Sequence, residues 1–81
     1  MEKNSANNHD AHPLEEWLDK NEKTVAEFQR MLKASGVRVT RYAIDLWLVE
    51  ESTPNLRNAY AIQKATGGDV TMEMLAEFSN F

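Results

Sequence analysis

The segment "VTRYAIDLWL", residues 39–48, has the residue pattern of an amphipathic helix and decides how the rest of the chain is interpreted. Ile44, Trp47 and Leu48 recur at the three- and four-residue spacing that places side chains on one helix face, which we expect to be buried. The opposite face carries Thr40, Arg41, Tyr42 and Asp45. This polar face is either a binding surface or the solvated side of an ordinary helix, and the pattern alone favours neither.

Two helices are predicted before this segment. Residues 13–20 open on Pro13, which suits the first turn of a helix because its missing N–H costs little there. Residues 24–35 open on Thr24 with Glu27 three residues later, which is the pattern of a capping box.

Three more helices are predicted in the second half of the chain. The central one runs from residue 40 to about residue 51. The next has Pro54 in its first helical position, with Ser52 or Thr53 as its cap, and the last opens at Thr71. We therefore expect an all-α fold, a compact bundle of about five short helices.

The residues that we expect in the core recur at helical spacing within these segments. They are Leu14, Trp17, Leu18, Val25, Phe28, Leu32, Ile44, Trp47, Leu48, Leu56, Ala59, Ile62, Ala65, Met74, Leu75 and Phe78, with Met31 and Tyr60 at the margins. The alternation in residues 37–39 is too short to predict a strand.

Length and composition indicate one small domain. The chain has 81 residues, no cysteine and no apolar run close to the roughly 18 residues of a membrane span. We therefore expect no disulfide, no cysteine zinc site and no membrane segment. The polar, acidic N-terminus is unlike a secretory signal, so we expect a cytoplasmic protein.

Residues 1–12 lack apolar periodicity and are rich in asparagine, which predicts a disordered tail before a domain spanning residues 13–81. His9, Asp10 and His12 could hold a metal weakly, but solvated side chains are the expected state. We predict no metal site and no cofactor.

Basic residues concentrate in the middle of the chain. The net charge is −4, yet residues 23–64 carry seven Lys and Arg against four acids. The stretch 28–41 contains four cations and no acid, namely Arg30, Lys33, Arg38 and Arg41. A single phosphate-binding face would have this distribution. Chance segregation in a short chain is the alternative.

Catalytic motifs are missing from the sequence. It has no glycine-rich phosphate loop, no Ser-His-Asp or Cys-His set and no histidine pair at metal spacing on a helix. The adjacent carboxylates of Glu15–Glu16 and Glu50–Glu51 would diverge by about 100° in a helix, so we expect them to be solvated. We do not expect an enzyme.

Residues 39–71, "VTRYAIDLWLVEESTPNLRNAYAIQKATGGDVT", resemble the helix-turn-helix family of Cro and the phage repressors, including the Cro-like YdaS group. The shared frame is V-T-R-x-A-I-x-x-W-L, then Pro54, then A-x-x-I-x-x-A-T-G-G-x-V-T. Thr24, Glu27, Phe28 and Leu32 match the scaffold helix of that family. The resemblance implies a compact all-α domain that binds double-stranded DNA sequence-specifically, usually as a dimer.

Positions in this frame suggest which residues would contact DNA. The base-reading candidates are Thr40, Arg41, Tyr42 and Asp45. The phosphate candidates are Thr24, Lys33, Arg38, Asn55 and Arg57. At the apolar C-terminus, Phe78 and Phe81 are candidate dimer residues, although a frayed end is the alternative for Phe81.

The chain also departs from the family pattern. About five extra residues, in the segment 33–39, lengthen the turn before Thr40 and would move the central helix relative to Thr24. Leu46 stands where a polar or basic residue is more usual. Glu50 and Glu51 stand where glycine and basic residues are common, and near phosphates they would be repulsive.

Two functions are therefore carried forward. The first is a phage-, prophage- or plasmid-type transcriptional repressor that binds a palindromic operator as a homodimer. The second is a protein-interaction module on the same fold, such as an antitoxin or an anti-regulator, with weak or no DNA binding.

Overall fold

The computed structural model describes residues 11–78, and within that range the chain forms five helices and no strand. The helices are α1 (Pro13–Lys20), α2 (Val25–Ala34), α3 (Arg41–Leu48), α4 (Leu56–Ala65) and α5 (Met72–Glu77). The all-helical fold predicted from the sequence is confirmed. None of these five helices is long and apolar enough to cross a lipid bilayer.

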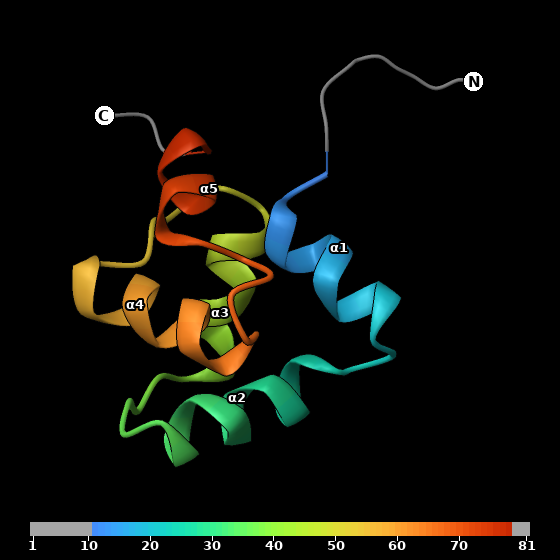
Figure 1. Ribbon diagram of the computed structural model, residues 1–81, viewed down its shortest axis with the longest axis vertical. Helices are drawn as coiled ribbons and strands as arrows, with labels where there is room; N and C mark the ends of the chain where they lie inside the picture. Colours follow the sequence, from blue (N-terminus) through green and yellow to red (C-terminus); the bar gives the residue numbers. More distant parts are fainter. Residues whose placement is uncertain (1–10, 79–81) are drawn as a thin grey trace.

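The helices pack around α4 and α2. Helix α2 lies against α3 and α4, and α5 lies against α4. In Figure 1, α1 and α5 occupy one end of the molecule and α2 the other, with α3 between them. The connection from α2 to α3 passes beside the start of α4, so residues distant in sequence meet on that side of the molecule.

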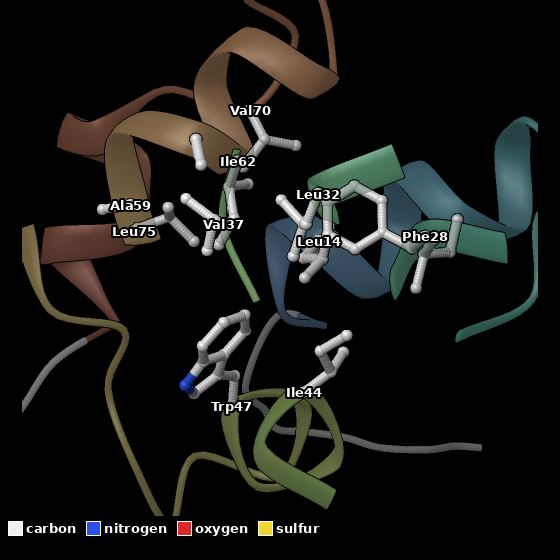
Figure 2. Close-up of a cluster of buried hydrophobic side chains, with 12 residues drawn as sticks. Leu14, Phe28, Leu32, Val37, Ile44, Trp47, Ala59, Ile62, Val70 and Leu75 are labelled. Atoms are coloured by element: carbon white, nitrogen blue, oxygen red, sulfur yellow. The ribbon is translucent and has the colours of Figure 1, made fainter. Parts of the chain in front are cut away.

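The core gathers side chains from all five helices (Figure 2). The most completely enclosed are Leu14, Phe28, Leu32, Ile44, Ile62 and Val70. Half-buried Trp17 closes one side, with its ring 5.9 Å from that of Phe28. Its indole N–H donates to the Asp69 carboxylate at 3.1 Å, so the one polar atom of this large ring has a partner outside the core.

Helices α1 to α4 all end in the same way. A backbone N–H just beyond each helix donates to a carbonyl five residues earlier, from Lys23 to Leu18, Val37 to Leu32, Glu51 to Leu46 and Gly68 to Gln63. This is the Schellman motif, which requires a left-handed residue immediately before the donor. Those residues are Glu22, Gly36, Glu50 and Gly67, with φ of 55°, 91°, 62° and 65°.

These motifs correct two predicted helix boundaries. Helix α3 ends at Leu48, not at residue 51, because Glu50 turns left-handed and closes the helix there. Helix α4 begins at Leu56 with Asn55 as its N-cap, and the Asn55 side chain accepts the N–H of Asn58 at 2.8 Å. Pro54 therefore lies before the cap, and the prediction that it occupies the first helical position is wrong.

His12, which was expected in the tail, belongs to the folded domain. Its Nδ1 accepts the N–H of Leu14 at 3.1 Å and caps α1, with Pro13 at the first helical position as predicted. The ring is buried and lies 5.3 Å from that of Phe78. Histidine is not a usual N-cap residue, so the sequence offered no local signal for this contact.

The core also differs from the prediction at several positions. Leu56, expected inside, is 76% exposed because it is the first residue of α4 and lines an open groove beside Met72, outside the core. Tyr60 is exposed as well. Val37, which lies outside any helix, and Ala61 are buried instead.

Candidate nucleic-acid interface

The turn between α2 and α3, residues 35–40, is anchored at both of its ends. Gly36 takes the left-handed conformation and allows the backbone of Val37 to return to Leu32, where the N–H and carbonyl oxygen are 3.0 Å apart. The Val37 side chain then enters the core. The hydrophobic contact between these two positions commonly accompanies a Schellman motif.

A second anchor lies at the far end of this turn. The side-chain amide of Gln29, in the middle of α2, donates to the carbonyl oxygen of Val39 at 2.9 Å. Val39 immediately precedes Thr40, whose hydroxyl accepts the N–H of Ala43 at 3.0 Å and caps α3. The start of α3 is therefore fixed relative to α2 by the turn itself.

Four exposed cations surround this turn. One hollow in the surface is lined by Gln29, Arg30, Lys33, Arg38, Val39 and Thr40. A second is lined by Gly36, Val37, Arg38, Asn55, Arg57 and Asn58. Arg38 lines both hollows, so Arg30, Lys33, Arg38 and Arg57 form one continuous surface, called here the cationic surface. No acidic residue lines either hollow.

The predicted base-reading residues lie at the edge of the cationic surface. Thr40 lines its first hollow, and Arg41 follows directly as the first residue of α3. Tyr42 is 71% exposed, and Asp45 is exposed one turn further along α3. Ile44 and Trp47 on the other side of the helix are buried, as predicted. Leu46 is half-buried.

The predicted phosphate residues divide into two groups. Lys33, Arg38, Asn55 and Arg57 all line the two hollows, as does Arg30, which was part of the basic stretch but was not predicted as a site residue. Its exposed position three residues before Lys33 on α2 is the signal that could have identified it.

Thr24 lies outside both hollows and has a structural partner. Its N–H donates to the Glu27 carboxylate at 2.8 Å, and its hydroxyl accepts the Glu27 N–H at 3.1 Å. The Thr24 backbone hydrogen bond lowers the pKa of Glu27, which keeps a negative charge at this end of α2. A phosphate at Thr24 would be repelled by that carboxylate, so Thr24 is unsuited to a phosphate contact.

Of the two C-terminal candidates for a dimer surface, the structure describes only Phe78. Phe78 is half-buried and its ring lies against His12. Phe81 lies outside the described residues.

His12 is unsuited to the metal-binding role considered for it with His9 and Asp10, because its Nδ1 already accepts the Leu14 N–H. Residues 11–78 contain no group of three side chains placed to hold a metal.

Comparisons of the chain with models of protein families, with curated proteins and with solved structures found no match. The functional assignment therefore depends on the geometry and charge of the surface described above.

Proposed function

We propose that this protein is a sequence-specific regulator that binds double-stranded DNA, with the N-terminal turn of α3 in the major groove. The observation that carries the proposal is the cationic surface, which borders Thr40 and contains no acidic residue. Its four cations are supplied by α2, the turn and α4, so one rigid face presents them together.

The two kinds of residue on this face suit different tasks. Lys and Arg side chains that contact phosphates supply most of the affinity for DNA but read no sequence. Thr40 and Arg41 are exposed at the start of α3 beside those cations, and we assign them to contacts with base edges. Arginine pairs best with guanine, and the Asp45 carboxylate can accept from the amino group of cytosine.

The excess of acid elsewhere gives the protein an orientation. The net charge is −4, so the faces outside the cationic surface repel the duplex. The protein therefore approaches DNA through the face that carries Arg38. We propose that it acts in the cytoplasm as a repressor of the Cro-like helix-turn-helix type, and as a homodimer, because one recognition helix reads only a few base pairs.

The test begins with selection of bound sequences from a random pool of duplexes. Affinity for the selected sequence is then measured by fluorescence anisotropy at several salt concentrations. We expect a steep loss of affinity with salt. Arg38→Ala should reduce the slope of log K against log salt by about 1, because one phosphate contact is lost. Lys20→Ala, an exposed cation at the end of α1, is the matched control and should leave the slope unchanged.

Failure to enrich any sequence, or equal effects of the Arg38 and Lys20 substitutions, would reject the proposal. A protein that fails this test but captures a polypeptide partner with weak salt dependence is instead the interaction module considered above, since contacts between apolar surfaces respond far less to salt than contacts with phosphates.

A further inference from the structure

A buried histidine joins the ends of three helices. The His12 ring is only 4% exposed, and its Nδ1 accepts the N–H of Leu14 at 3.1 Å in the first turn of α1. Its centroid lies 5.3 Å from that of the Phe78 ring, directly after α5. The segment that follows α3 passes beside the start of α1 (Figure 1) and brings the Glu50 carboxylate near the ring. One titratable group therefore connects α1, the end of α3 and the end of α5.

These contacts require a neutral ring. A neutral imidazole has one acceptor nitrogen, and the cap of α1 uses it, whereas both nitrogens of a protonated ring are donors. A proton on Nδ1 would point at the Leu14 N–H and remove the cap. The positive charge would also lie at the positive end of the α1 dipole and away from water. Burial accordingly lowers the pKa of His12.

Glu50 occupies a position that favours glycine. It has a φ of 62° in the Schellman motif that ends α3, a conformation that is costly for a residue with a Cβ. The half-buried Glu50 carboxylate raises the pKa of His12 and so opposes part of the effect of burial. Glu22 takes the same position after α1, but its side chain is exposed and does not act on the ring.

The other acidic groups on these three elements are exposed to solvent. They lie in the first turn of α1, directly after Glu50 and in the last turn of α5, and they are Glu15, Glu16, Glu51 and Glu77. Water screens exposed carboxylates, so their effect on a buried ring is weak. Glu50 is therefore the anion that a protonated His12 would approach.

We propose that His12 and Glu50 form a pH-operated switch between these three helix ends. While His12 is neutral, its cap and its contact with Phe78 hold the start of α1 and the end of α5 together. Once His12 is protonated, the ring leaves the cap, turns toward the Glu50 carboxylate and separates from Phe78. The cationic surface is formed by α2, the turn and α4, and it stays folded. The switch goes beyond the proposed function and does not depend on it.

The first test is an NMR titration of the full chain without DNA, from about pH 7.5 to about pH 5. The Leu14 amide signal should move with the same midpoint as the His12 ring, and cross-peaks between the His12 and Phe78 rings should disappear below it. The Ala43 amide is the internal control, because the Thr40 hydroxyl that caps it has no proton to gain in this range. Cross-peaks that persist below the midpoint, or an Ala43 signal that changes together with Leu14, would overturn the proposal.

A second test measures the part played by Glu50. Glu50→Gln keeps the size and the left-handed position but removes the charge, so the midpoint of the His12 ring should shift to lower pH. Glu22→Gln is the matched control at the equivalent position after α1 and should leave that midpoint unchanged. Equal midpoints for Glu50→Gln and the wild type would reject Glu50 as a part of the switch.

A third test removes the proton from the cap. His12→Asn keeps a capping acceptor that does not titrate, so the Leu14 amide signal should stay in place over the same range of pH. His9→Asn distinguishes the signals of the two histidines and should leave the Leu14 titration intact. A Leu14 signal that still titrates in His12→Asn would assign the change to another group and reject the switch. Because no measurement includes DNA, failure of the switch and failure of the proposed function are distinguishable.

Discussion

The side-chain amide of Gln29 donates to the carbonyl oxygen of Val39 at 2.9 Å, across ten residues that include the whole turn between α2 and α3. This bond acts on the residue before the cap of α3, and so connects the start of α3 to the middle of α2. The turn therefore has two anchors, the side-chain amide of Gln29 and the buried side chain of Val37.

Gln29→Met should remove the anchor and keep the side-chain volume. The Val39 carbonyl would lose its partner in a partly buried site, so we expect a loss of about 0.5–1.5 kcal/mol in the free energy of unfolding. Affinity for the selected DNA should fall by more than this loss of stability explains, because α3 is less well placed. Urea unfolding and anisotropy measure the two effects. A variant with wild-type stability and affinity would show that the bond does not position α3.

Arg41→Ala should lower specific DNA binding by about 1–3 kcal/mol, the effect expected for loss of a bidentate base contact. Affinity for an unrelated duplex should change much less. Arg38→Ala, in contrast, should weaken binding to both duplexes by similar factors, since Arg38 is proposed to contact phosphate. Competition titrations at fixed salt separate these patterns. Equal losses on both duplexes for Arg41→Ala would place it among the phosphate contacts.

Glu22→Gly should stabilise the protein by about 0.5–1 kcal/mol. Glu22 has a φ of 55°, a conformation that costs a non-glycine residue about 1–2 kcal/mol, and the greater freedom of glycine when unfolded offsets part of the gain. Glu22→Ala is the control, because it removes the same charge and keeps the strained Cβ. Thermal unfolding should rank glycine above alanine, and the reverse order would contradict the explanation.

The protein should lose stability as the pH falls below about 6.5, the ordinary pKa of histidine. Burial lowers the pKa of His12, although the nearby Glu50 carboxylate partly opposes the shift. The unfolded chain therefore binds a proton more readily than the folded one. The stability that neutral His12 contributes is complete above its unfolded pKa and is lost as the pH falls through its lower folded pKa.

Urea unfolding at about pH 7.5 and about pH 5.5 measures this effect. His12→Asn should flatten the pH dependence, since asparagine caps a helix without a proton to gain. His9→Asn is the matched control and should keep the dependence of the wild type. If the two substitutions flatten it equally, His12 is not the responsible group.

Thr66→Val should cost about 1–3 kcal/mol of stability. The buried hydroxyl donates to the Ile62 carbonyl at 2.9 Å and accepts the Val70 N–H, so valine leaves that N–H without its partner. Thr66→Ser keeps the hydroxyl and should retain most of the stability relative to valine. Chemical denaturation of the three proteins tests this order, and equal losses for serine and valine would assign the effect to the methyl group.

Local sequence signals were sufficient to predict most of the helices. They failed where contacts between distant residues determine a helix start or the edge of the folded domain. The capping pair Thr24 and Glu27 gave the start of α2 correctly, because both partners lie within four residues. The start of α4 was misplaced since Asn55 and Pro54 both suit a helix N-terminus, and the choice depends on how the preceding loop returns from α3. His12 was placed in the tail because its contact with Phe78 spans almost the whole domain.

The candidate site shows the same division. The basic stretch around Lys33 and Arg38 was visible as composition, and spacing identified the outward face that begins at Thr40. Arg57 lies far along the chain, yet it lines the same hollow as Arg38. Sequence spacing could not predict this neighbourhood, because it depends on the turn passing the start of α4. The exposure of Leu56 was hidden for a related reason, because Leu56 has the spacing of a core residue.

The common ending of helices α1 to α4 also bears on how fast this protein folds. Each Schellman motif closes a helix through bonds that span only six residues, so it can form without waiting for distant parts of the chain. Helical domains dominated by such short-range contacts reach the native state in roughly microseconds to milliseconds. A chain that folds on this timescale exposes its apolar surfaces only briefly after synthesis, and so has little time to aggregate before the core closes.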